Sequence, residues 1–228
     1  MNESFFEQIQ NSAEFLNLDL SAQEMAQLSM QYAMDAETVH AVAEVFAYLK
    51  DKRSTSIIAT LLRLSRLPLK EPKTFESFDF TQLHGKNVDA LKLLPSLSAV
   101  YAHKNLAFIG PQGVGKTHLA MAYGRECCNR GLKTYFMKAT ELNQKLTDAR
   151  KYGRESSTIA GLVKPSCLVI DEVGRCVFDK EYIETALYLI FTPNTGLFFA
   201  YCSIFCGFVG ASEPTHCGLS LICRLNLQ

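Results

Sequence analysis

The stretch that decides the fold is Gly110-Pro-Gln-Gly-Val-Gly-Lys-Thr117, which lies between the apolar run Asn105–Ile109 and a helix-forming segment that begins at His118. Its glycines allow the backbone to curl around a chain of phosphates. The first turn of the following helix directs unpaired N–H groups at the same anion. The stretch therefore predicts a phosphate-binding P-loop between a buried strand and a helix.

Each side chain of this loop has an expected role in binding ATP and Mg²⁺. Lys116 reaches the β- and γ-phosphates and is counted among the catalytic residues, while the Thr117 hydroxyl is a ligand of Mg²⁺. His118 is expected to be a polar neighbour of the site rather than a catalytic residue. The predicted nucleotide-binding residues are Gly110, Pro111, Gln112, Gly113, Val114, Gly115, Lys116, Thr117 and His118.

A second motif follows downstream. The short apolar run Ser166–Ile170 is typical of a buried parallel strand and ends in the carboxylate pair Asp171-Glu172. Parallel strands end at the same edge of a sheet, so this pair is expected beside the P-loop, as in a Walker B motif. We expect Asp171 to hold Mg²⁺ and Glu172, as the catalytic carboxylate, to orient the attacking water.

Composition limits the class of protein. With 228 residues, 48% of them hydrophobic, the chain can bury the core of an α/β domain and carry a small helical appendage. Its acidic N-terminus does not resemble a signal peptide, so we expect a cytoplasmic protein with free thiols. The net charge is zero, but a basic stretch, Lys52–Lys70, follows an acidic one and weakly indicates a nucleic-acid partner.

The N-terminal part is predicted to be helical. A capping box at Ser21–Glu24 begins one helix, Asp35 caps a second, and a third amphipathic helix runs from Ile57 until Pro68 stops it. Arg53, Arg63 and Arg66 either contact a phosphate backbone or form a solvated face, and the sequence favours the face. The expected division is a helical domain over 1–66, a linker over 67–79, an ATPase core over 80–192 and a divergent apolar tail over 193–228.

The core is predicted to alternate strands and helices, which favours a parallel sheet covered by helices on both faces. The P-loop helix should end at Arg130 with Gly131 at its left-handed cap. A strand is expected over Thr134–Met137. Thr140 should then cap a helix that ends at Gly153.

These residues resemble the IstB family of transposition helper ATPases. The similarity extends from about Ile57 to Glu181 and is carried by Leu61–Phe80, Asn105–Ala120, Glu126–Phe136 and Ile170–Gly174. It implies an AAA+ fold related to that of the DnaC helicase loader, and a protein that binds ATP, oligomerises on DNA and serves a partner transposase. By position, it assigns the phosphates to Gly113–Thr117, Mg²⁺ to Asp171 and the water to Glu172.

The end of the chain departs from that family. No charged residue occurs over Thr185–Ser212, and the sensor residue and the arginine that the family places here are missing. A frameshifted or truncated reading frame would explain this, and it predicts impaired ATP hydrolysis. The expected function is an ATP-binding transposition helper. The alternatives are a DnaC-like helicase loader or a non-hydrolysing, nucleotide-dependent interaction module.

The apolar part of this tail, Leu197–Val209, has three alternative interpretations besides poor packing. A membrane helix is disfavoured because Pro193, Asn194 and Gly196 interrupt the roughly 20 apolar residues that it needs. A zinc site is disfavoured because the spacing of Cys202, Cys206, His216, Cys217 and Cys223 matches no ligand template. The third alternative is an inner strand of the sheet beside the Walker B strand. We expect poor packing instead, because a replaced frame has not been matched to the core.

Overall fold

The computed structural model describes residues 4–84, 88–178, 199–203, 221–224 and 226–227. The chain divides into two compact units, Met1–Thr60 and Leu61–Gln228. The expected boundaries at residues 66, 79 and 192 stay predictions.

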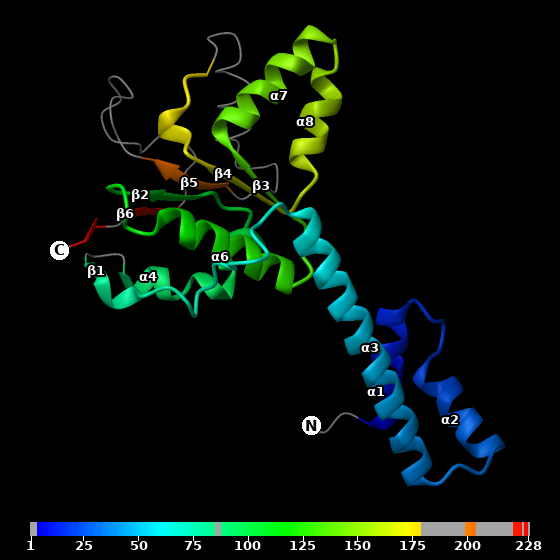
Figure 1. Ribbon diagram of the computed structural model, residues 1–228. Coiled ribbons are helices and arrows are strands. Elements are labelled where there is room, and N and C mark those ends of the chain that lie inside the picture. Colours follow the sequence, from blue (N-terminus) through cyan, green and yellow to red (C-terminus); the bar gives the residue numbers. More distant parts are fainter. Residues whose placement is uncertain (1–3, 85–87, 179–198, 204–220, 225, 228) are drawn as a thin grey trace. The chain divides into compact units, whose positions relative to one another are not determined.

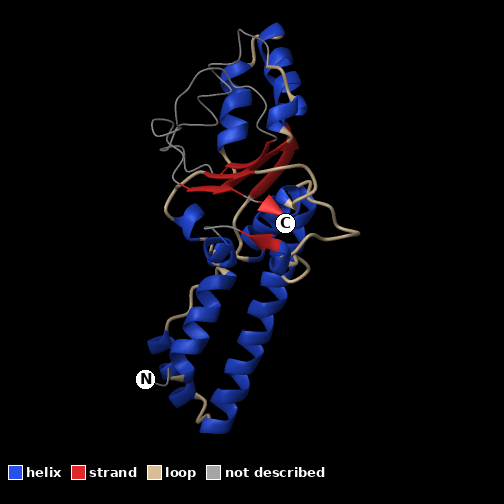
Figure 2. Ribbon diagram, turned by 90° about the vertical axis from the view of Figure 1, so that its left-hand side faces the viewer, coloured by secondary structure: helices blue, strands red, loops and turns tan. Residues whose placement is uncertain are grey.

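The first unit is built from helices (Figure 2). They are α1 (Phe5–Leu16), α2 (Ala22–Gln31) and the greater part of α3 (Ala36–Leu64). The capping box predicted at Ser21 is confirmed, since Glu24 N donates to Ser21 Oγ at 3.2 Å and Ser21 N donates to the Glu24 carboxylate at 2.8 Å. Asp35 accepts from Thr38 N at 2.8 Å and begins α3 as expected. A small core of Ile9, Met25, Val39 and Ala43 holds these helices together.

The expectation of separate second and third helices is wrong. The structure has one continuous helix, α3, of 29 residues. No glycine or proline occurs between Ala36 and Leu64, so nothing interrupts the i to i−4 hydrogen bonds across the polar residues 51–56. A polar stretch changes which face of a helix is buried, but it does not end the helix.

The second unit contains every strand of the described chain. Before the P-loop come η1 (Phe80–Gln82), β1 (Leu83–His84), α4 (Val88–Lys92), η2 (Leu94–Ser96), α5 (Ser98–Tyr101) and β2 (Leu106–Ile109). The core continues with α6 (Lys116–Asn129), β3 (Thr134–Lys138), α7 (Ala139–Lys151), α8 (Glu155–Val163), β4 (Cys167–Asp171) and η3 (Val173–Arg175). The last described elements are β5 (Phe199–Ser203), β6 (Leu221–Arg224) and β7 (Asn226–Leu227).

Five of these strands form one parallel sheet in the order β3-β4-β5-β2-β6. Helix α6 lies against one face of the sheet, and α7 and α8 lie on the other (Figure 1). Strands β1 and β7 pair separately and antiparallel, with Leu83 opposite Leu227. The prediction of a parallel sheet with helices on both faces is confirmed.

The two faces of the sheet bury alternate residues of the same strands. Phe108 of β2 and Val169 of β4 belong to the core under α6, which also contains Leu119 and Tyr123. Their chain neighbours Ala107 and Leu168 belong to the core under α7 and α8. Side chains in a strand alternate between the two faces, so both faces of these strands must be apolar. This is why the strands appear in the sequence as unbroken apolar runs.

The described part of the tail corrects our expectation of poor packing. Phe199–Ser203 forms β5, an inner strand whose backbone pairs with β4 on one side and β2 on the other. Ladder hydrogen bonds join backbone groups, so a strand can take this position without the side chains that the family has there. Of the residues considered for zinc, Cys206, His216 and Cys217 lie outside the described residues.

Two further differences concern helices beside β3 and β4. Thr140 does not cap α7, because β3 passes directly into the helix and Lys138 occupies the N-cap position. Helix α8 is absent from the predictions. The left-handed ends at Gly131 and Gly153 are confirmed, with φ of 76° and 63°. In the part of the chain that the structure describes, no helix combines the length and the apolar character that crossing a membrane requires.

Candidate nucleotide-binding site

The P-loop connects the end of β2 to the start of α6. Gly113 and Gly115 have φ of 86° and 87°, which is the left-handed region that side chains with a Cβ rarely adopt. Gly115 is also the N-cap of α6, so the turn at this residue directs the first N–H groups of the helix toward the loop. The glycines in the motif are therefore required by the backbone conformation itself.

Two buried residues of the loop face in different directions. Val114 is 3% exposed and packs into the core under α6. Lys116 is 6% exposed, and its Nζ donates to the carbonyl oxygen of Pro111. The ammonium group is thus held inside the curve of the loop, where an anion with several oxygens would meet both the charge and the backbone N–H groups.

Thr117 and Asp171 meet although they come from different motifs. Thr117 Oγ1 lies 3.1 Å and 3.2 Å from the two carboxylate oxygens of Asp171, to which it donates. Asp171 ends β4 and is 4% exposed. A hydroxyl and a carboxylate are hard oxygen ligands of the kind that Mg²⁺ prefers, so this pair fits the predicted magnesium site. When bound, Mg²⁺ would bridge phosphate oxygens and neutralise their charge.

Glu172 has an unusual backbone and two cationic partners. Its φ is 58°, in the left-handed region, and its backbone N–H donates to Asp171 Oδ1 at 2.9 Å. Lys138 Nζ lies 3.2 Å from Glu172 Oε2, and Arg175 Nη1 lies 3.6 Å from Oε1. Non-glycine residues in this conformation are uncommon and often occur at functional sites.

These residues surround one cavity of about 330 Å³, within the usual range of small-molecule sites. Its lining combines the P-loop backbone with the end of β4 and with η3: Gln112, Gly113, Gly115, Lys116, Thr117, Asp171, Glu172 and Arg175. Of the predicted site residues, Gly110, Pro111, Val114 and His118 are not part of this lining. Their role in binding stays a prediction.

His118 faces the segment that precedes the sheet. Its Nε2 lies 2.8 Å from the Thr74 carbonyl oxygen and 3.2 Å from Ser77 Oγ. The ring also packs edge-on against Phe78, with centroids 5.2 Å apart. These contacts fit the expectation of a polar neighbour that positions the chain beside the loop.

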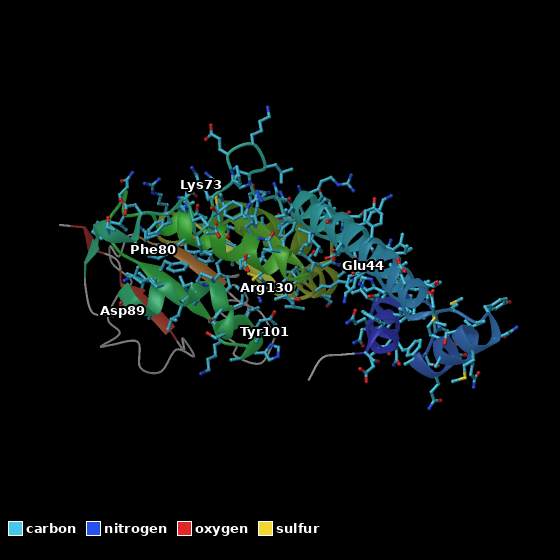
Figure 3. All side chains as sticks on the ribbon, turned by 90° about the horizontal axis from the view of Figure 1, so that it is seen from below. Glu44, Lys73, Phe80, Asp89, Tyr101 and Arg130 are labelled. Carbon is cyan, nitrogen blue, oxygen red and sulfur yellow. The ribbon has the colours of Figure 1, made fainter. Side chains whose placement is uncertain are left out.

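Phe78 connects that segment to the P-loop. A Cβ placed on Gly115 would overlap the ring of Phe78, so the loop and the ring are in close contact. Phe78 packs in turn against Phe80, with ring centroids 4.8 Å apart. Phe80, labelled in Figure 3, packs against the core under α6. The residues Thr74–Phe80 thus support the glycine turn from outside.

Arg66, one of the cationic groups considered for nucleic acid, makes contacts within its own unit. Arg66 Nη1 lies 2.7 Å from Glu141 Oε2, and its guanidinium lies 5.6 Å from the ring centre of Tyr135. The hydrogen bonds to Tyr135 and Glu141 raise the pKa of Arg66 above its ordinary value, so it stays charged. Arg154 lies over the Tyr152 ring, 5.2 Å from its centre. The contacts with Glu141 and Tyr135 therefore give the charged side chain of Arg66 a structural role.

Sequence reasoning missed Arg175 and Lys138. Arg175 follows Glu172 by three residues, on η3, and a 3₁₀ turn brings residues at that spacing to the same side. This spacing was the available signal. Lys138 gives no local signal, because only the pairing of β3 with β4 places it opposite Asp171.

Comparison with known proteins identifies the family of the chain. The profile of the family described as IstB-like ATP binding protein matches residues 11–192. The chain is 38% identical to the protein named as the ATP-binding protein of insertion sequence IS5376 from Geobacillus stearothermophilus, over 59% of this chain and 53% of that relative. It is 28% identical to the corresponding IS232 protein of Bacillus thuringiensis subsp. berliner, over 81% of this chain and 74% of the relative. The chain thus spans about half of the first relative's length.

Among solved structures, the replication initiator DnaA bound to AMPPCP and single-stranded DNA superposes with a TM-score of 0.53. The match covers 72% of this chain and 52% of that chain, at 19% sequence identity. At this identity the likeness establishes the fold alone, which is that of P-loop AAA+ ATPases.

Proposed function

Since the chain belongs to the family of IstB-like ATP-binding proteins, we propose that it is a transposition helper that uses Mg-ATP to assemble on DNA and to assist a partner transposase in target selection. The observation that carries the proposal is the contact between Thr117 and Asp171, because it joins the P-loop and the Walker B strand in one cavity with Lys116. Phosphate and Mg²⁺ need these two motifs together.

The roles of the site residues follow from their positions. Lys116 and the N–H groups of Gly113 and Gly115 bind the phosphates, and Thr117 with Asp171 holds Mg²⁺. Glu172 orients a water molecule toward the terminal phosphate, provided that it leaves its two cationic partners. The relatives are named for insertion sequences and for ATP binding, which favours a task in transposition.

DNA and a second copy of the chain are the partners proposed with the transposase. The DnaA structure of the same fold carries single-stranded DNA, and two of the described arginines, Arg53 and Arg63, are exposed. Their charge suits a phosphate backbone. A cytoplasmic protein is also proposed, because transposition takes place on cellular DNA.

Calorimetric titration with Mg-ATP tests the core of this proposal. Replacing Lys116→Ala removes a buried, charge-assisted contact of about 1.5–3 kcal/mol, so ATP affinity should fall about ten- to a hundredfold. Lys104→Ala is the matched control, because it removes the same charge from an exposed position outside the cavity. Equal ATP affinity in the wild type and the Lys116 variant would overturn the assignment.

DNA-dependent assembly needs its own measurement. Fluorescence anisotropy of a labelled duplex should rise with wild-type protein in Mg-ATP and much less in Mg-ADP or with Lys116→Ala. A rise that is the same with and without nucleotide would separate DNA binding from the ATP site and contradict this part of the proposal.

A non-hydrolysing, nucleotide-dependent interaction module is the second candidate. It is favoured by the two ion pairs that hold Glu172 and by the absence of charged residues from Thr185–Ser212. Such a module would bind different partners when ATP is bound, and it would not hydrolyse the ATP. Phosphate release in the presence of DNA distinguishes the two candidates.

A further inference from the structure

Glu172 lies between two cations that come from different parts of the sheet edge. Lys138 ends β3, and its Nζ is 3.2 Å from Glu172 Oε2. Arg175 belongs to η3, and its Nη1 is 3.6 Å from Oε1 of the same carboxylate. One carboxylate needs only one cation to balance its charge, so one of the two is available for another anion.

The cavity distinguishes the two cations. Arg175 is part of its lining, together with Lys116 and Thr117, whereas Lys138 is not. Arg175 ends η3, four residues after the end of β4, and lines the cavity together with the carboxylates of Asp171 and Glu172. In P-loop proteins the terminal phosphate of the nucleotide lies between the loop and this strand end.

We propose that Arg175 is a ligand of the terminal phosphate of ATP, supplied by the same chain, and that it exchanges Glu172 for this phosphate when ATP binds. The proposal rests on the ATP binding proposed above. Arg175 would then be the residue by which the site binds ATP more tightly than ADP. Once the terminal phosphate is gone, the guanidinium returns to Glu172.

The strengths of the competing contacts favour this exchange. The Arg175 to Glu172 distance of 3.6 Å exceeds that of a hydrogen bond, and the two side chains are 53% and 33% exposed. Ion pairs of this kind contribute little in water. A guanidinium with a phosphate makes two parallel, charge-assisted hydrogen bonds, which are among the strongest polar contacts in proteins.

The backbone holds the donor in place during this exchange. Arg175 N donates to the carbonyl oxygen of Glu172 at 2.9 Å and closes the 3₁₀ turn. The turn begins at the left-handed residue Glu172. Only the Arg175 side chain has to rotate for this exchange.

Titration of the full chain with ATP and with ADP tests the proposal, each in the presence of Mg²⁺. For Arg175→Gln we expect about a tenfold loss of ATP affinity, as for one charge-assisted contact, with ADP affinity changed less than about threefold. Lys138→Gln is the matched control, because it removes the other cation beside Glu172 and should leave the ratio of ATP to ADP affinity unchanged. Arg175→Lys should restore part of the ratio, since it keeps the charge but not the paired hydrogen bonds.

The possible outcomes separate this proposal from the one on which it rests. If the wild type binds neither nucleotide, the proposed function itself fails. If the wild type binds ATP and Arg175→Gln leaves the ratio of ATP to ADP affinity unchanged, only the role of Arg175 is overturned. If Lys138→Gln lowered the ratio of ATP to ADP affinity as much as Arg175→Gln does, the role of Arg175 would also be overturned. The effect would then come from the charge around Glu172.

Discussion

Thr117 and Asp171, 54 residues apart in the chain, are joined by a hydroxyl whose oxygen lies 3.1 Å and 3.2 Å from the two carboxylate oxygens. The first residue lies in the first turn of the P-loop helix and the second ends the Walker B strand. The parallel direction of β2 and β4 places both ends at one edge of the sheet. This contact defines the position that we assign to Mg²⁺.

The Asp171→Asn variant should lose the dependence of ATP affinity on Mg²⁺. Asparagine keeps the shape and an oxygen that accepts from Thr117, but it removes the negative charge that attracts the cation. Calorimetry with ATP in Mg²⁺ and in EDTA measures the effect. If Mg²⁺ still raises the affinity of the variant as much as that of the wild type, Asp171 does not hold the metal.

Alanine at Gly115 should destabilise the second unit more than alanine at Gly113. Both glycines have left-handed φ, so each substitution costs about 1–2 kcal/mol of backbone strain. Only at Gly115 does a Cβ also overlap the Phe78 ring, which adds about 1–3 kcal/mol. Denaturant unfolding of both variants measures the difference.

The double variant Gly115→Ala with Phe78→Ala is the control for that explanation. Removing the ring should abolish the additional cost, so the two substitutions should not be additive. Additive costs would show that Phe78 is not the obstacle.

Purified protein should turn ATP over no faster than its Glu172→Gln variant, even with DNA present. The resemblance to the family implies a sensor residue and an arginine after Glu181, but Thr185–Ser212 carries no charge, and an arginine supplied in trans can contribute ~10³ to 10⁵ in rate. Phosphate release is the measurement. Multiple turnovers that disappear in the Glu172 variant would contradict the prediction and indicate a complete ATPase.

Deletion of all residues after Thr192 should now abolish the cooperative thermal transition of the second unit. Without the described fold, we would expect the deletion to leave the ATP site and the solubility intact. The structure reverses this expectation, because the deletion removes β5 and leaves β2 and β4 without the strand that joins them. A truncated chain that still unfolds cooperatively and binds ATP would restore the original view of the tail.

The positions of the P-loop, the Walker B strand and several helix ends were predictable from local sequence. Gly113 and Gly115 are needed wherever φ is positive, Ser21 and Asp35 cap the helices that follow them, and Gly131 and Gly153 end theirs. These preferences depend on a residue and its near neighbours, which one sequence contains completely. The continuous helix α3 was missed because a polar stretch was taken for a break.

By itself, the sequence determined that a phosphate-binding loop follows a buried strand and that two carboxylates follow another strand of the same sheet. Only the tertiary structure decided that Lys138 faces Glu172, that Phe78 lies against Gly115, and that Phe199–Ser203 fills the position between β2 and β4. The physical reason is the range of the interactions. Capping and turn preferences act within a few residues, whereas strand pairing and ion pairs join residues whose separation in the chain carries no signal of their contact.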